Sequence, residues 1–153
     1  MAAYIVVVED DFLQEGPLEE YLADTFPTAR IETLTTESAF RERFPDFRQT
    51  KPDIVIMDVM LRWAVPSPKM TPPPPDVIDG EYFRAGLRCA ELLSKDEALS
   101  RVPVIVYTIL ERGDLESSGE SLREISAYLR KSADLEMLAR KIRDLVPPDR
   151  LAN

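Results

Sequence analysis

Short apolar runs alternate along the chain with longer segments of helical periodicity. The runs are rich in β-branched residues and too short for helices, which is typical of strands buried on both faces of a sheet. We expect five strands, at residues 4–8, 31–35, 53–57, 102–107 and 125–129. The second and fifth runs are the weakest of the five, because polar residues interrupt them.

Amphipathic segments fill the intervals between these strands. Apolar residues recur in them at spacings of three and four, as on one face of a helix. Pro17 is expected in the first turn of the first helix, where a missing N–H does no harm. Pro45 is expected to end or bend the second helix, and Pro147 and Pro148 to stop the last. The predicted helices are residues 17–26, 36–44, 81–95, 115–124 and 133–146.

One stretch, residues 62–80, fits neither pattern. It holds Pro66, Pro68 and four consecutive prolines at 72–75. Proline fixes φ and removes a backbone donor, so we expect extended polyproline geometry here, not a helix or a central strand. We therefore predict a single domain over residues 1–153 with a proline-rich insertion at about 62–80.

The alternation of strands and helices predicts an α/β fold, with right-handed crossovers joining parallel strands into a doubly wound sheet. Ligands of such sheets bind outside the carboxyl ends of the strands. Polar side chains follow four of the five expected strands at this edge. They are Glu9, Asp10 and Asp11 after the first strand, Asp58 after the third, Thr108 after the fourth and Lys131 after the fifth.

Carboxylates gathered at one edge repel each other, and at neutral pH they need raised pKa values or a cation between them. A hard divalent ion meets this need, and Mg²⁺ commonly bridges carboxylates to phosphate. Asp58 can then act as a nucleophile and form an aspartyl phosphate, with Lys131 and the Thr108 hydroxyl facing the phosphoryl oxygens. Taken singly, each residue has a plainer explanation: Asp11, for example, can cap a helix. Only the combination at four strand ends favours the functional interpretation.

Composition narrows the function classes further. A net charge of −9 argues against nucleic acid as a direct partner. The chain has no histidine, which removes the usual general base and any phosphohistidine chemistry within the chain. Cys89 is the single cysteine, so we expect a buried apolar residue and no internal disulfide. With no signal-like N-terminus and no apolar run near the ~20 residues of a membrane helix, we expect a soluble cytoplasmic protein.

These residues resemble the receiver domain of response regulators. Residues 6–11 are similar to the first strand and acidic pocket of the family, and residues 54–61 to its phosphoacceptor strand. Residues 102–108 resemble the fourth strand with its switch hydroxyl, and Tyr128 and Lys131 have the spacing of the aromatic switch residue and the lysine. The resemblance covers the chain except the proline-rich stretch. It implies a flavodoxin-like fold, with a five-stranded sheet of order 2-1-3-4-5 flanked by five helices.

The resemblance also implies residue roles. Asp58 would be the phosphoacceptor, Lys131 would contact the phosphoryl group, and Thr108 and Tyr128 would be switch residues. The switch would report to the face formed by the fourth helix, fifth strand and fifth helix. The implied cofactor is Mg²⁺, with Asp10 favoured as a direct ligand. The full set of implied metal ligands is Glu9, Asp10, Asp58 and the backbone carbonyl of Met60.

Three positions depart from the family pattern. Arg62 stands where a proline usually follows the acceptor, and the insertion begins there. Ile109 replaces the usual small residue after the switch hydroxyl, and Ser132 replaces a proline in cis after the lysine. Ile109 and the insertion can restrict access to the site, and Ser132 leaves the placement of Lys131 open. For the insertion two alternatives stay open beside a lid: a solvated surface loop and a docking surface for a partner.

The leading interpretation is a stand-alone receiver that is not an enzyme, beyond its own phosphoryl transfer and autodephosphorylation. It would take its phosphoryl group from a sensor histidine kinase or a histidine phosphotransfer protein, and bind a downstream protein partner. The main alternative is a pseudo-receiver, an interaction module that works without phosphorylation. A phosphatase with an aspartyl-phosphate intermediate is a third class. Met60 stands where such an enzyme usually has its general acid.

Overall fold

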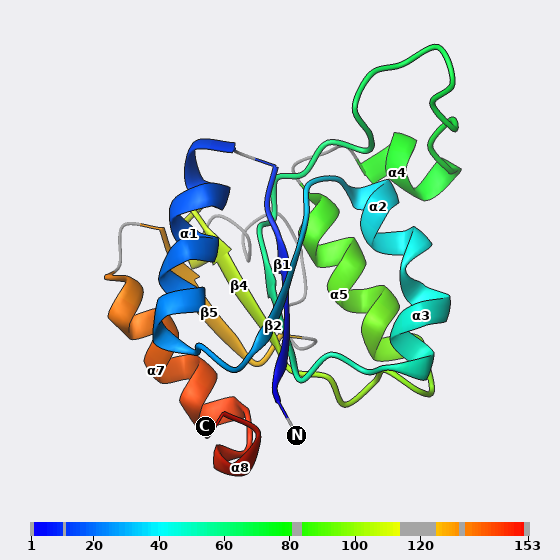
Figure 1. Ribbon diagram of the computed structural model, residues 1–153. Coiled ribbons are helices and arrows are strands. Elements are labelled where there is room, and N and C mark those ends of the chain that lie inside the picture. Colours follow the sequence, from blue (N-terminus) through cyan, green and yellow to red (C-terminus); the bar gives the residue numbers. More distant parts are fainter. Residues whose placement is uncertain (1, 11, 81–83, 114–124, 132–133, 152–153) are drawn as a thin grey trace.

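A five-stranded parallel sheet forms the centre of the computed structural model, which describes residues 2–10, 12–80, 84–113, 125–131 and 134–151 (Figure 1). The strand order is β2-β1-β3-β4-β5, and every neighbouring pair is parallel. The predicted fold class and strand order are confirmed. The strands are β1 (Tyr4–Val8), β2 (Arg30–Leu34), β3 (Ile54–Met57), β4 (Val104–Thr108) and β5 (Ala127–Arg130).

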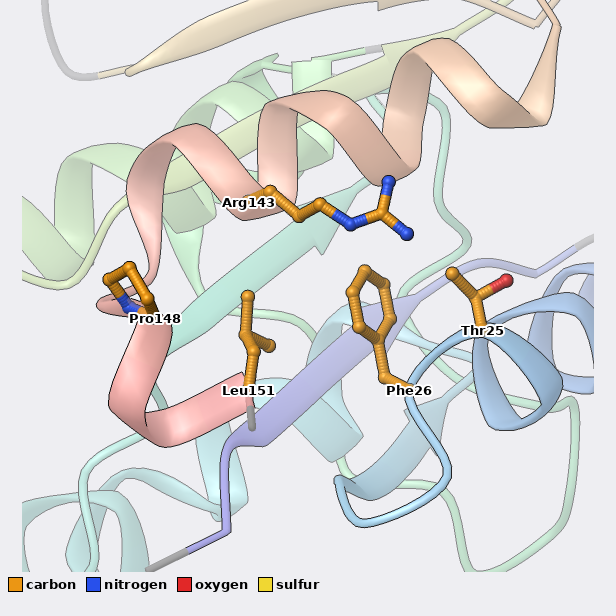
Figure 2. A pocket seen from close by; sticks show the side chains of 5 residues that line it. All are labelled: Thr25, Phe26, Arg143, Pro148 and Leu151. Carbon is orange, nitrogen blue, oxygen red and sulfur yellow. The ribbon is translucent and has the colours of Figure 1, made fainter. Parts of the chain in front are cut away.

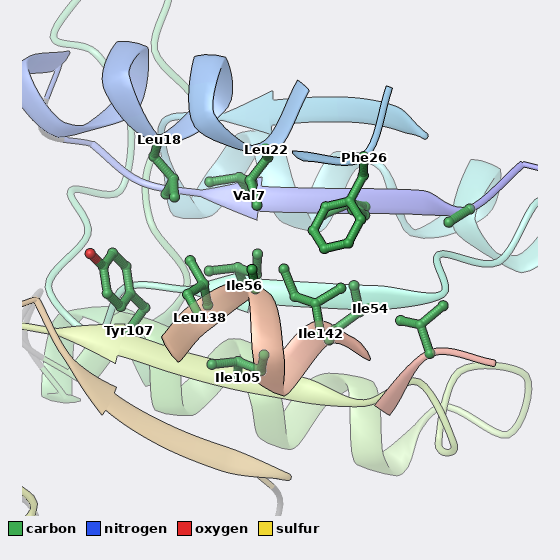
Figure 3. Packing of buried hydrophobic residues seen from close by; sticks show 14 of the residues in the cluster. Val7, Leu18, Leu22, Phe26, Ile54, Ile56, Ile105, Tyr107, Leu138 and Ile142 are labelled. Carbon is green, nitrogen blue, oxygen red and sulfur yellow. The ribbon is translucent and has the colours of Figure 1, made fainter. Parts of the chain in front are cut away.

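Successive strand residues point to opposite faces of the sheet, and in the central strands all of them are buried. Helices therefore cover both faces. Ile5 and Val7 of β1 pack in a cluster with residues of α1 (Phe12–Thr25) and α7 (Leu135–Leu145), which Figure 3 shows. Val6 and Val8 belong to the cluster on the other face. That face is covered by α2 (Glu37–Glu42), α3 (Phe44–Gln49) and α5 (Ala85–Lys95).

The first helix is longer than predicted. α1 begins at Phe12, and Pro17 lies inside it instead of in its first turn. An interior proline removes a helix hydrogen bond, so propensity alone would not favour this helix. Leu18 and Leu22 are buried against the sheet, and this packing outweighs the local cost.

The single helix predicted at 36–44 is two helices. Thr36 is the N-cap of α2, and its hydroxyl oxygen accepts a hydrogen bond from the Ala39 N–H at 3.1 Å. Pro45 does not end the segment; it lies in the first turn of α3, where its missing N–H is tolerated. Phe47, fully buried in the core, holds α3 in place.

Two short helices that the sequence did not predict begin with a proline. α4 (Pro75–Gly80) lies in the insertion, so the expectation that residues 62–80 exclude helix is wrong for the last six. α8 (Pro148–Leu151) follows directly after the predicted stop. The helix predicted at 115–124 lies outside the described residues. Within those residues, none of the helices combines the length and the apolar character that crossing a bilayer requires.

Gly86 lets the start of α5 approach the segment that follows β3. Its N–H donates a hydrogen bond to the Val59 carbonyl at 2.9 Å. A Cβ at this position would lie 2.1 Å from the Asp58 carbonyl oxygen and 2.7 Å from the Val59 Cα. These are backbone atoms that cannot swing away, so only glycine permits the contact.

We predict that Gly86→Ala destabilises the domain by about 1–3 kcal/mol, the usual cost of overpacking. The matched control is Gly16→Ala in α1, where a Cβ meets nothing within 4 Å. There alanine should stabilise by about 0.5–1 kcal/mol, since Gly16 lies in a helix interior. Urea unfolding of both variants checks this. Equal effects of the two substitutions would contradict the close approach at Asp58.

Candidate functional site

The described residues of the predicted site lie at the carboxyl edge of the sheet, and Asp11 lies outside the described residues. Glu9 and Asp58 follow adjacent strands, and backbone hydrogen bonds extend the ladder to both of them. The Glu9 N–H donates to the Leu34 carbonyl at 2.9 Å, and the Asp58 N–H donates to the Val8 carbonyl at 3.0 Å. The Lys131 N–H donates to the Thr108 carbonyl at 2.8 Å, so the residue after β5 is fixed in the same way.

Lys131 lies between two buried carboxylates. Its Nζ is 2.8 Å from Asp58 Oδ2 and also contacts Glu9 Oε1. The side chains of Lys131, Asp58 and Glu9 are only 7%, 8% and 2% exposed. The three charges are therefore shielded from water, where their interaction is stronger than at a surface.

The burial and the crowding of acids shift the pKa values of this group. Burial, a hydrogen bond with Asp58 and repulsion from its charge raise the pKa of Glu9 to about 8, although Lys131 acts in the opposite direction. Burial by itself lowers the pKa of Lys131, but the hydrogen bonds to Asp58 and Glu9 outweigh it and raise the value. Lys131 is thus held in its charged form beside two acids.

Glu9, Asp10 and Asp58 form a cluster that fits a divalent cation. Each offers one carboxylate oxygen, and the three oxygens lie within 4.8 Å of one another. An all-oxygen, acidic donor set is the kind that Mg²⁺ prefers. The Met60 N–H donates to Asp58 Oδ1 at 3.3 Å and so helps to orient that carboxylate. The role of the Met60 carbonyl as a metal ligand stays a prediction.

The two predicted switch residues contact the same backbone unit after β4. The buried Thr108 hydroxyl oxygen accepts a hydrogen bond from the Leu110 N–H at 3.4 Å. The half-buried Tyr128 hydroxyl donates to the Leu110 carbonyl. Its ring packs against a small cluster that includes Val59 and Val106. Ile109, which was expected to restrict access, is 59% exposed at the surface.

Several contacts at the site involve residues that the sequence did not single out for this role. The backbone of Leu110 joins Thr108 to Tyr128, and Gly86 admits α5 next to Asp58. Arg62, which the sequence marked as a departure from the family pattern and as a residue able to approach the phosphoryl oxygens, contacts Asp10 through its N–H at 3.1 Å. The backbone contacts of Leu110 carry no sequence signal. Gly86 does carry one, because a glycine at the start of a helix can indicate a close backbone contact.

Other candidate features do not offer comparable chemistry. A cavity of about 370 Å³ lies where the ends of α1 and α7 meet α8 (Figure 2). Phe26 and Arg143 line it, with the guanidinium 5.3 Å from the ring centroid. None of the described residues that line it carries a carboxylate. Cys89 is fully buried on α5 as predicted, and burial raises the pKa of its thiol well above the ordinary range, which makes it a poor nucleophile.

Comparison with known proteins gave matches only among solved structures. No protein-family model matches the chain. No curated protein matches it either.

Many solved receiver domains share the fold. The receiver domain of a sensor histidine kinase from Pseudomonas aeruginosa, solved with a magnesium ion in its active site cleft, has a TM-score of 0.65 at 18% identity. The match covers 95% of this chain and 98% of that one. A CheY-like receiver domain from Methanospirillum hungatei gives a TM-score of 0.65 at 19% identity, over 94% and 93% of the two chains. A receiver domain of a histidine kinase from Syntrophus aciditrophicus gives 0.64 at 24% identity, over 94% and 89%.

These identities establish the architecture and leave the chemistry to the site residues. The strand order, the helices on both faces and the near-complete coverage agree with one another. The chain therefore has the CheY-like fold of response-regulator receiver domains.

Proposed function

We propose that this chain is a receiver module of a two-component phosphorelay in which Asp58 accepts a phosphoryl group in a Mg²⁺-dependent reaction. The observation that carries the proposal is the placement of Lys131 between Glu9 and Asp58, buried at the carboxyl edge of a 2-1-3-4-5 sheet. Asp10 completes the acidic cluster beside it. An ordinary structural ion pair would not need two buried carboxylates on one lysine and a third acid next to them.

The contacts of Asp58 suit a nucleophile. Oδ1 accepts from the Met60 N–H and Oδ2 from Lys131, so the carboxylate is held in one orientation. An Asp58 oxygen would attack the phosphorus of a phosphohistidine donor. The O–P bond forms as the P–N bond breaks, and the electron pair leaves with the imidazole. Lys131 is the buried cation available to the phosphoryl oxygens. Mg²⁺ held by Glu9, Asp10 and Asp58 would offset the charge of the incoming group.

The switch would pass through the segment after β4. Once Asp58 carries a phosphoryl group, the Thr108 O–H would donate to a phosphoryl oxygen. A shift of the hydroxyl toward that oxygen would break the long contact, 3.4 Å, in which it accepts from the Leu110 N–H. Movement of Leu110 would then change the acceptor of the Tyr128 hydroxyl, which reaches the same residue from β5. The proposed output surface combines the predicted helix at 115–124 with β5 and α7, and its ligand would be a downstream protein.

The phosphoryl donor and the cellular location that we propose follow from the composition of the chain. With no histidine in the chain, the phosphoryl donor would be a sensor histidine kinase or a histidine phosphotransfer protein. We assign no enzyme activity beyond self-catalysed phosphoryl transfer and autodephosphorylation. The proposed location is cytoplasmic, with neither nucleic acid nor membrane as a partner, in keeping with the net charge of −9.

A pseudo-receiver is the second candidate, and one observation favours it. Lys131 and Arg62 already contact the acidic cluster, so part of its charge is balanced within the chain. Such a module would keep the fold and bind a partner without taking up phosphate. Labelling of Asp58 separates the two functions.

We predict that acetyl phosphate and Mg²⁺ add one phosphoryl group to the wild-type protein, and that Asp58→Asn and Asp58→Ala abolish the addition. Both variants should stay folded, because removing one carboxylate relieves repulsion within the cluster. Intact-mass measurement detects the product. Asp144→Asn, at an exposed position on α7, is the matched control and should label normally. Labelling that persists in Asp58→Ala would refute the assignment.

The raised pKa of Glu9 predicts a pH dependence of stability in the metal-free protein. Folded Glu9 keeps its proton up to about pH 8, whereas an unfolded glutamate loses it above its ordinary value of 4.5. The folded state binds more protons in this window, so its stability falls as the pH rises from about 5 to 8. Glu9→Gln should lack this fall and gain stability over wild type as the pH increases.

Urea unfolding in EDTA across this pH range measures the difference. Glu91→Gln, at a half-exposed surface position of α5, is the control and should follow the wild-type profile. Parallel profiles for Glu9→Gln and wild type would show that Glu9 is ionised at neutral pH.

Figure 1 shows the loop that precedes α4 standing out from the body of the domain, beside α2 and α4. We therefore expect a docking role for it and not control of access. Replacing residues 64–74 with a short Gly-Ser link, which keeps Arg62, Trp63 and α4, should leave phosphorylation by acetyl phosphate and later hydrolysis unchanged. Time courses of intact mass measure both rates. Faster labelling together with faster hydrolysis would instead assign the insertion to access.

A further inference from the structure

The insertion is fastened to the body of the domain at both of its ends. The first N–H groups of α2 donate to its start, from Glu37 to the Arg62 carbonyl at 2.9 Å and from Ser38 to the Trp63 carbonyl at 2.8 Å. The Trp63 ring lies over the Arg41 guanidinium, 5.5 Å from its carbon to the ring centroid. At the far end, α4 is fixed by Asp76, whose carboxylate lies 2.9 Å from the same guanidinium.

A fully buried carboxylate holds this anchor in place. Glu37 is inaccessible to water and lies 2.8 Å from Arg41 and 2.8 Å from Arg88 of α5. A buried charge is costly unless it is paired, so Glu37 fixes both guanidinium groups firmly. α2, α5 and the insertion are thereby joined at one point, and the position of Arg62 is set by the fold.

Arg62 connects this anchored insertion to the acidic cluster. Its N–H donates to Asp10 Oδ2 at 3.1 Å, and its Nε lies 3.7 Å from the same oxygen. The carbonyl of Arg62 is bound by α2 at the same time. The residue therefore bridges α2 and Asp10, with the backbone orienting the carboxylate and the guanidinium adding a positive charge beside it.

We propose that Arg62 is a built-in counter-charge that lowers the affinity of the acidic cluster for divalent cations. The inference rests on the metal site of the proposed function and adds a residue that controls it. The guanidinium and a metal ion would be drawn to the same carboxylate of Asp10, and their positive charges repel each other. Because the Arg62 side chain is 54% exposed, its charge is screened, so it tunes metal binding and does not block it.

The test is direct metal binding, without any phosphoryl donor. Mn²⁺ is titrated into metal-free protein while the EPR signal of the free ion is followed, and Mg²⁺ affinity is obtained by competition. Arg62→Ala keeps the backbone contacts to Asp10 and α2 and should bind both ions about two- to fivefold more tightly. Arg62→Lys, which keeps the charge, should stay close to wild type. The gain from Arg62→Ala should shrink as KCl is raised.

Two further variants complete the design. Lys69→Ala removes the same charge from an exposed position of the insertion and should leave affinity unchanged. Asp10→Ala should weaken binding most, and Glu9→Gln less. If Arg62→Ala binds no more tightly than wild type and Lys69→Ala, the inference is wrong while the proposed function stands. If wild-type protein binds neither ion, both the metal role and the inference fail.

Discussion

The charge pairing of Lys131 with Glu9 and Asp58 is the constraint on which the site depends. One lysine beside two buried acids cannot neutralise both, and burial makes any uncompensated charge expensive. The chain meets this cost by keeping Glu9 partly protonated near neutral pH, as its pKa of about 8 indicates. The parallel sheet brings the three groups together from the ends of β1, β3 and β5. The site therefore exists only when the whole sheet is formed.

The buried carboxylate of Glu37 differs from the acidic cluster at Glu9, Asp10 and Asp58 in its charge balance. Glu37 is paired with two arginines, Arg41 and Arg88, and its charge is fully compensated. This group of charges has a structural role: it joins α2, α5 and the insertion. The cluster at Glu9 has the opposite balance, with more acids than cations around it. Once Glu9 is ionised, the acids of this cluster outnumber Lys131 and Arg62, which would favour a divalent ion at this edge.

The sequence predicted the sheet, and which residues come together at its edge, because both follow from strong local signals; the roles of those residues stay predictions. Apolar runs define strands, and the topology then brings the residues after them to one edge. The proline assignments were less successful. Pro17 lies inside a helix, and Pro45 and Pro75 each lie in the first turn of one, because tertiary packing and chain direction decide whether a proline stops or starts a helix. The contact of Arg62 with Asp10 could not be predicted from the sequence either, because it joins a backbone N–H to a residue 52 positions away.

The charge balance also shows why the proposed reaction needs a cation beyond those of the chain. Glu9, Asp10 and Asp58 share two cations, Lys131 and the half-exposed Arg62, so acids and cations balance only while Glu9 is protonated. A phosphoryl group on Asp58 adds further negative charge and several strong acceptors. Lys131 can then bind the phosphoryl oxygens only by weakening its contact with Glu9, which would leave a buried acid without its partner. Either Glu9 takes a proton or a divalent ion enters beside Asp10. At a pH above the pKa of Glu9 only the ion remains, so in the proposed reaction phosphorylation and metal binding would be coupled through the same buried charges.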